Sequence, residues 1–164
     1  MLMKWCQWIN NLSISASVRD SLWLFPAIGW VHLYSMILLM VGIAALDLRL
    51  MGITIERGLQ QPVLRLARRV RIWAWIWLSV NAVTGSFLFA SKAPDYYINP
   101  AFRLKILLVL LGVVYHSFIL PAIVRPRVTR WDASSGAPFE AKITGAFSLL
   151  LWVGVIIASQ WIAA

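Results

Sequence analysis

The sequence is poor in the residues on which most catalytic and metal-binding sites depend. It has one cysteine, two histidines and six acidic residues among its 164 residues. The single cysteine, Cys6, excludes an intramolecular disulfide and any multi-cysteine metal or iron–sulfur site. The sequence also lacks a C-x-x-C-H haem-attachment motif, a glycine-rich phosphate-binding loop and a serine nucleophile elbow. These absences disfavour c-type haem proteins, phosphate-loop proteins and hydrolases.

Charged residues are scarce as well, whereas hydrophobic residues are abundant. Charged residues make up 13% of the chain and hydrophobic residues 61%, against roughly 25% and 45–50% in a soluble domain. The mean hydropathy is +0.78. A single domain of this size cannot hide so much apolar surface from water. We therefore predict an integral membrane protein that forms one transmembrane domain over residues 1–164.

Four apolar stretches are long enough to cross a bilayer, which takes about 20 residues. Because backbone groups in lipid need internal hydrogen-bond partners, these stretches must be helical. The sequence therefore predicts an all-α antiparallel four-helix bundle with spans at about 22–46, 72–91, 104–124 and 143–163.

The segments beside these spans carry signals of their own. Residues 1–20 place Trp5, Trp8 and Leu12 on one helical face and predict a short interfacial helix. They lack the continuous apolar core of a cleavable signal peptide. Asn99 followed by Pro100 predicts the N-cap and first residue of a helix.

Basic residues outnumber acidic ones, with 15 lysines and arginines and a net charge of +9. They flank the apolar stretches, which favours a role in membrane topology and lipid headgroup contact over nucleic-acid binding. Ten of the fifteen lie in the first and third connections between spans. The positive-inside rule then predicts that these connections lie in the cytoplasm and that both termini lie outside.

Both histidines, His32 and His116, lie inside apolar stretches, where ionisable residues suggest a functional site. Counted from Leu22 and Leu104, the starts of their spans, both sit roughly 15–18 Å below the outer surface. Two imidazoles at one level of a four-helix bundle suit the axial ligation of haem b. The leading hypothesis is therefore a b-type cytochrome-like electron-transfer module.

Small and basic residues near the histidines fit the haem hypothesis. Gly29 and Gly112 lie one turn before His32 and His116, respectively, and would leave room for a macrocycle. Asn81 falls at a similar depth on the second span. At the outer mouth, Arg103 and Lys105 are candidates to meet the propionates. A quinone or a periplasmic redox protein would be the partner, and the chain would be a subunit of a larger membrane complex.

Two alternatives stay open. His32, Met36 and Met40 follow one another at i, i+4 and i+8, a stripe of soft ligands that suits copper. Each histidine would instead simply hydrogen-bond a neighbouring helix in a cofactor-free anchor or assembly protein.

The acidic residues all fall in connections or at the ends of spans, which disfavours an acid-driven carrier. Asp47 lies where the first span ends, two residues before Arg49. We expect it to pair with an arginine of the basic segment that follows Pro62 and to act as a structural lock.

Several motifs are distinctive: His32-Leu33, the DLRL of residues 47–50, Thr84-Gly85, the YxxNPAFRxK-like run of residues 96–105, and His116. With these motifs nearly the whole chain resembles an uncharacterised group of bacterial four-span inner-membrane proteins, a domain of unknown function. The resemblance implies a bacterial inner-membrane protein, with both termini in the periplasm. Members often carry a glutamate shortly before the first histidine, where this chain has Gly29-Trp30. The layout more distantly resembles membrane proteins of the copper-resistance D type and the haem-binding protoporphyrinogen oxidase type.

Overall fold

The computed structural model describes residues 1–53, 63–122 and 137–163, and every regular element in these ranges is a helix. The long helices are α3 (Leu24–Leu50), α4 (Val63–Ser91), α6 (Pro100–Val114) and α8 (Phe139–Ala163). A π-helical turn, η1 (Tyr115–Ile119), follows α6, and the same helix then continues to Ala122. All four are long and apolar enough to cross a membrane, which confirms the all-α fold and the membrane class predicted from the sequence.

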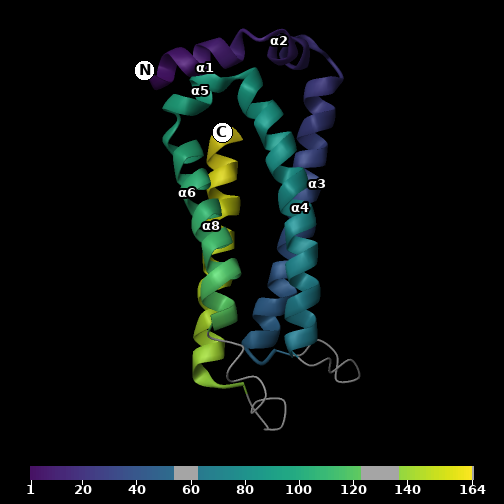
Figure 1. Cartoon of the computed structure of the whole chain (residues 1–164), viewed down its shortest axis with the longest axis vertical. Coiled ribbons are helices and arrows are strands. Elements are labelled where there is room, and N and C mark those ends of the chain that lie inside the picture. Colours follow the sequence, from purple (N-terminus) through teal and green to yellow (C-terminus); the bar gives the residue numbers. More distant parts are fainter. Residues whose placement is uncertain (54–62, 123–136, 164) are drawn as a thin grey trace.

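Three short helices lie across one end of the long ones (Figure 1). They are α1 (Leu2–Asn10), α2 (Ser13–Asp20) and α5 (Ala93–Ile98). The single helix predicted over residues 1–20 is in fact two helices, because the chain turns at Asn11 and Leu12. Helix α1 packs on α5, and α2 packs on α4 and α3.

The long helices extend beyond the predicted spans at several ends. Helix α4 begins at Val63 instead of residue 72, and α3 continues to Leu50. Helical hydrogen bonding does not stop where the hydrocarbon stops, so the arginine-rich segment simply continues α4. At the other end of the molecule the predicted cap is confirmed, because the Asn99 side chain accepts hydrogen bonds from the backbone N–H groups of Ala101 and Phe102.

The long helices form two antiparallel pairs, α3 with α4 and α6 with α8 (Figure 1). The two pairs are joined chiefly along α3 and α8, whereas α4 and α6 have almost no close backbone approach. Glycine permits the closest approach between the pairs. A Cβ at Gly145 of α8 would lie 2.6 Å from the carbonyl oxygen of Asp47 on α3.

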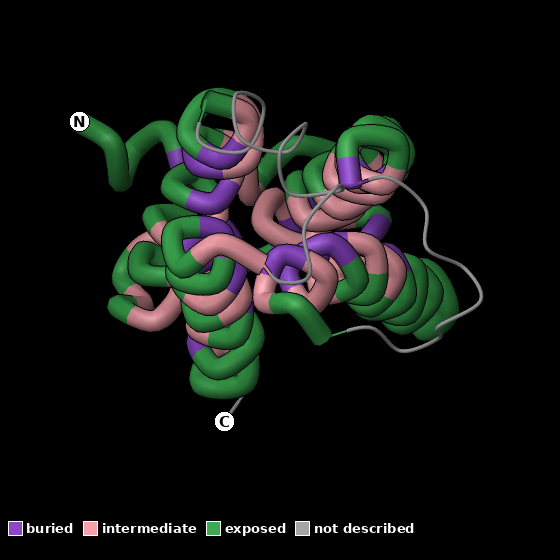
Figure 2. Tube along the Cα trace, turned by 90° about the horizontal axis from the view of Figure 1, so that it is seen from below, coloured by how far each residue is buried: buried purple, intermediate pink, exposed green. Residues whose placement is uncertain are grey.

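The core is limited to the lines where helices meet, and the outer faces are exposed (Figure 2). One buried cluster is formed by Leu39, Ile43, Trp152 and Val155 of α3 and α8. A second brings together Leu46 and Leu50 of α3, Tyr115 of η1 and Leu120, which follows η1. The outward faces carry large exposed apolar side chains such as Ile37, Leu110 and Leu150, as expected where helices face lipid.

Candidate functional site

The first polar cluster in the bundle surrounds His32. Its Nδ1 lies 3.0 Å from Thr84 Oγ1 on α4, and its Nε2 lies 3.5 Å from Lys105 Nζ on α6. The Thr84 hydroxyl donates to the Val80 carbonyl, so its oxygen accepts from Nδ1–H of His32. That tautomer leaves the Nε2 lone pair facing the Lys105 ammonium.

Asn81 completes this cluster. Its Nδ2 donates to the His32 carbonyl at 2.9 Å and to Ser35 Oγ at 3.0 Å. A Cβ at Gly85 would lie 3.0 Å from His32 Cε1, so the imidazole rests directly on the α4 backbone. The His32 cluster therefore ties α3, α4 and α6 together with its polar atoms paired.

The second polar cluster surrounds His116 in the π-helical turn. His116 Nε2 lies 2.8 Å from Ser148 Oγ on α8, and the ring centroid lies 6.1 Å from that of Trp152. The neighbouring Tyr115 hydroxyl donates to the Thr144 carbonyl at 2.9 Å. A π turn places one more residue in the turn than an α-helix does, and such turns are frequent at functional sites.

Asp47 lies close to this second cluster and is fully buried. Neither carboxylate oxygen has a hydrogen-bond partner in the described part of the chain, although the Ser148 hydroxyl of α8 lies nearby. The arginine partner predicted for Asp47 is not found, since the ion pair recorded among the described residues joins Arg19 to Asp20. The sequence prediction also missed that Asp47 is enclosed, because α8 covers it at Gly145.

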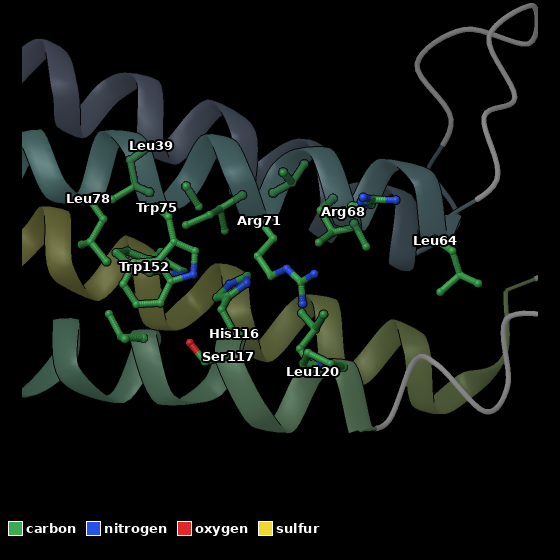
Figure 3. A pocket seen from close by; sticks show the side chains of 17 residues that line it. Leu39, Leu64, Arg68, Arg71, Trp75, Leu78, His116, Ser117, Leu120 and Trp152 are labelled. Atoms are coloured by element: carbon green, nitrogen blue, oxygen red, sulfur yellow. The ribbon is translucent and has the colours of Figure 1, made fainter.

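A cavity of about 250 Å³ lies beside His116, between α4 and η1 (Figure 3). Its walls are mostly leucine, isoleucine, alanine and tryptophan side chains from α3, α4, α6, η1 and α8. Its polar lining comes from Arg68, Arg71, His116 and Ser117, and Trp75 and Trp152 supply its aromatic lining. In Figure 3 the Arg71 side chain extends from α4 into the space beside His116 and Leu120.

This cavity is not predicted from the sequence, because the arginines of α4 indicate membrane topology equally well. One signal was available. Leu64, Arg68, Arg71, Trp75 and Leu78 follow a spacing of three or four residues, and all five line the cavity. A stripe that mixes arginine and tryptophan with leucine is too polar to face only lipid. It therefore predicts a helix face that also lines an internal space.

The structure does not bring His32 and His116 together. The α6 residue beside His32 is Lys105, which precedes His116 by 11 residues, or about 16 Å along a helix. The equal depth predicted from the sequence does not hold, because α3 begins at Leu24 instead of Leu22 and α6 begins at Pro100 instead of Leu104. The arrangement therefore gives no geometric support for one haem shared by these two histidines.

The other predicted haem-site residues have separate surroundings. Asn81 and Lys105 contact His32, as described above. A Cβ at Gly112 would lie 2.9 Å from Trp152, so Gly112 accommodates that ring. Nothing lies within 4 Å of a Cβ at Gly29. Arg103 donates from Nε to the Tyr97 carbonyl at 2.8 Å and lies over the Tyr97 ring.

The predicted copper stripe is also divided. Met36 and Met40 pack against the buried cluster of Leu39 and Trp152, whereas both ring nitrogens of His32 face other partners. In the described ranges, no three histidine, cysteine, aspartate or glutamate side chains gather to hold a metal. Copper binding and haem binding stay predictions.

Comparison with known proteins identifies a family. A family profile described as "Family of unknown function (DUF6644)" matches residues 24–164, so the chain belongs to that family. No curated protein and no solved structure shows significant similarity to the chain. The family match confirms the resemblance to a domain of unknown function.

Proposed function

We propose that this member of a family of unknown function is a membrane-embedded binding protein, whose cavity beside His116 takes a lipid-soluble ligand from the bilayer. The observation that carries the proposal is the position of the cavity. It is lined by α4 and η1, where the backbones of α4 and α6 have almost no close approach and where the lining residues Leu64 and Trp75 stay exposed. A ligand in the bilayer therefore has a lateral route between α4 and α6.

The chemistry of the lining supports a small-molecule site. Binding sites for small ligands are mainly apolar and carry a few polar groups that fix orientation. Here Leu39, Ala74 and Leu78 give apolar walls, while His116 and Ser117 provide hydrogen-bonding groups. The other polar cluster in the bundle is a poorer candidate for a binding site. Both ring nitrogens of His32 are already engaged, by Thr84 and Lys105.

Tryptophan quenching tests this proposal, because Trp75 and Trp152 line the cavity. Dibromostearic acid quenches nearby indole fluorescence and serves as the probe. We expect saturable quenching of the detergent-purified protein, and a several-fold loss of affinity in Ala74→Phe, which fills the cavity. Ala82→Phe on the same helix is the control, since Ala82 is exposed and does not line the cavity. Equal quenching in both variants would contradict the proposal.

The electron-transfer and copper hypotheses from the sequence belong to a different class and have a different test. Absorption spectra of the purified protein, oxidised and dithionite-reduced, and metal analysis decide them. If the protein shows a Soret band and each of His32→Ala and His116→Ala abolishes it, both imidazoles bind one haem iron. That result would overturn our proposal of a binding protein for a lipid-soluble ligand.

A further inference from the structure

The charge of the cavity lining narrows the ligand class. Arg68, Arg71 and His116 line it, and no acidic side chain does. Neither arginine forms an ion pair with a carboxylate in the ranges that the structure describes. The two heads lie apart, because Arg71 extends beside His116 whereas Arg68 stays along α4 on the side toward Leu64 (Figure 3). The cavity lining therefore holds positive charge and no carboxylate to balance it.

The direction of the Arg71 side chain makes this charge significant. The apolar span of α4 begins at about residue 72, so Arg71 lies at the boundary of the hydrocarbon. An arginine there can extend along the helix toward the headgroups and water. Instead, the Arg71 side chain turns toward η1, beside His116 and Leu120 (Figure 3).

The size of the cavity indicates which part of the ligand it holds. Sites that enclose a whole drug-sized ligand measure about 300–1,000 Å³, and this cavity measures about 250 Å³. It therefore has room for a headgroup and the first few methylenes, and the rest of an acyl chain must pass out between α4 and α6. Trp75 and Trp152 provide apolar surface next to the polar lining.

From these observations we infer that the ligand is an anionic amphiphile, whose carboxylate or phosphate binds Arg71 beside His116 while its acyl chain lies between α4 and α6. A guanidinium group matches both anions in geometry and can bind them through paired hydrogen bonds. A neutral ligand would leave the Arg71 guanidinium without an anion, and a cationic one would be repelled. This inference rests on the proposed function and adds the ligand class to it.

The test compares dibromostearic acid with its methyl ester at alkaline pH, where the free acid is ionised and the ester is neutral. Both carry the same acyl chain and the same quencher, so they differ only in head charge. We expect the acid to bind the purified protein at least about tenfold more tightly than the ester, the range for a hydrogen bond to a charged group.

Variants locate the charge effect. Arg71→Gln is expected to weaken binding of the acid about tenfold and to leave binding of the ester unchanged. Arg71→Lys keeps the charge and is expected to retain part of the affinity. Arg65→Gln is the matched control, because Arg65 is an exposed arginine of α4 outside the cavity. Equal affinity for acid and ester, or equal weakening of both by Arg71→Gln, overturns the inference.

The source of the anion is distinguished in nanodiscs that contain brominated phosphatidylglycerol. If this lipid quenches the protein and Arg71→Gln reduces the quenching, the anion comes from a bilayer phospholipid. If only added acid quenches, the anion is a free fatty acid.

The proposed function and the inferred ligand class fail in different ways. If only the anion class is wrong, Ala74→Phe still weakens both probes, and if the cavity binds nothing, Ala74→Phe affects neither.

Discussion

Asp47 is a fully buried carboxylate, and neither of its oxygens has a hydrogen-bond partner among the described residues. Burying a polar group without a hydrogen bond is unfavourable by about 1–3 kcal/mol in mutational data. Replacing such a group with an apolar side chain of similar shape removes that penalty. We therefore expect Asp47→Leu to raise the free energy of unfolding by about 1–3 kcal/mol, measured by denaturation in mixed micelles.

The opposite outcome for Asp47 is equally informative. A loss of stability in Asp47→Leu would contradict the prediction and would mean that the carboxyl has a favourable partner.

Ser148→Ala tests the contact of His116, because it removes the hydroxyl that lies 2.8 Å from His116 Nε2. It is expected to destabilise the protein by about 1–3 kcal/mol, since it leaves a half-buried imidazole nitrogen without that contact.

Single residues also show what the sequence could and could not predict. The apolar surroundings of His32 and His116 predict that each needs a polar partner inside the bundle. Both do contact polar groups on other helices. Which groups they contact could not be derived, because Thr84 and Ser148 lie 52 and 32 residues away in the chain. Partner choice depends on which helix faces which, and hydropathy does not encode that.

At the scale of elements, the contact between α3 and α8 depends on Gly145. A Cβ there would lie 2.6 Å from the Asp47 carbonyl oxygen and 3.1 Å from Leu50 Cβ, and the first of these is a backbone atom that cannot simply rotate away. We expect Gly145→Ala to lower the free energy of unfolding by about 1–3 kcal/mol through overpacking.

Gly29→Ala is the matched control for this prediction. It lies in α3, and the added methyl group would have nothing within 4 Å of it. Alanine is favoured over glycine inside a helix by roughly 0.5–1 kcal/mol, so this variant should be slightly stabilised. Thermal unfolding of both variants in one detergent checks the pair, and equal shifts would rule out close packing as the cause.

Helix ends were predicted less well than helix positions, for a physical reason. Hydropathy reports where side chains prefer lipid, and it located all four spans. The helices themselves end where backbone hydrogen bonding ends, so charged segments such as residues 63–71 of α4 extend them. The Asn99-Pro100 start was predictable because capping is local chemistry. The π-helical turn was not, since YHSFI carries no local signal for it.

At the scale of the whole molecule, the positive-inside rule predicts that α1, α2 and α5 face the periplasm. Single cysteines in a Cys6→Ser background test this orientation. We expect Leu22→Cys, at an exposed residue near α2, to react with an impermeant maleimide in intact cells. Ile53→Cys, exposed at the other end of α3, should react only after the membrane is opened. Labelling in the reverse order would overturn the orientation.

The joining of the two helix pairs mainly along α3 and α8 has a mechanical consequence. A pivot about that line would change the separation of α4 and α6 and would preserve the hydrogen bonds within each pair. It would stretch the contact between Lys105 of α6 and His32 of α3, which joins the two pairs. The opening between α4 and α6 that we propose for an acyl chain can thus widen without any helix unwinding. Spin labels on α4 and α6 would report this as a broad distance distribution that narrows on loading.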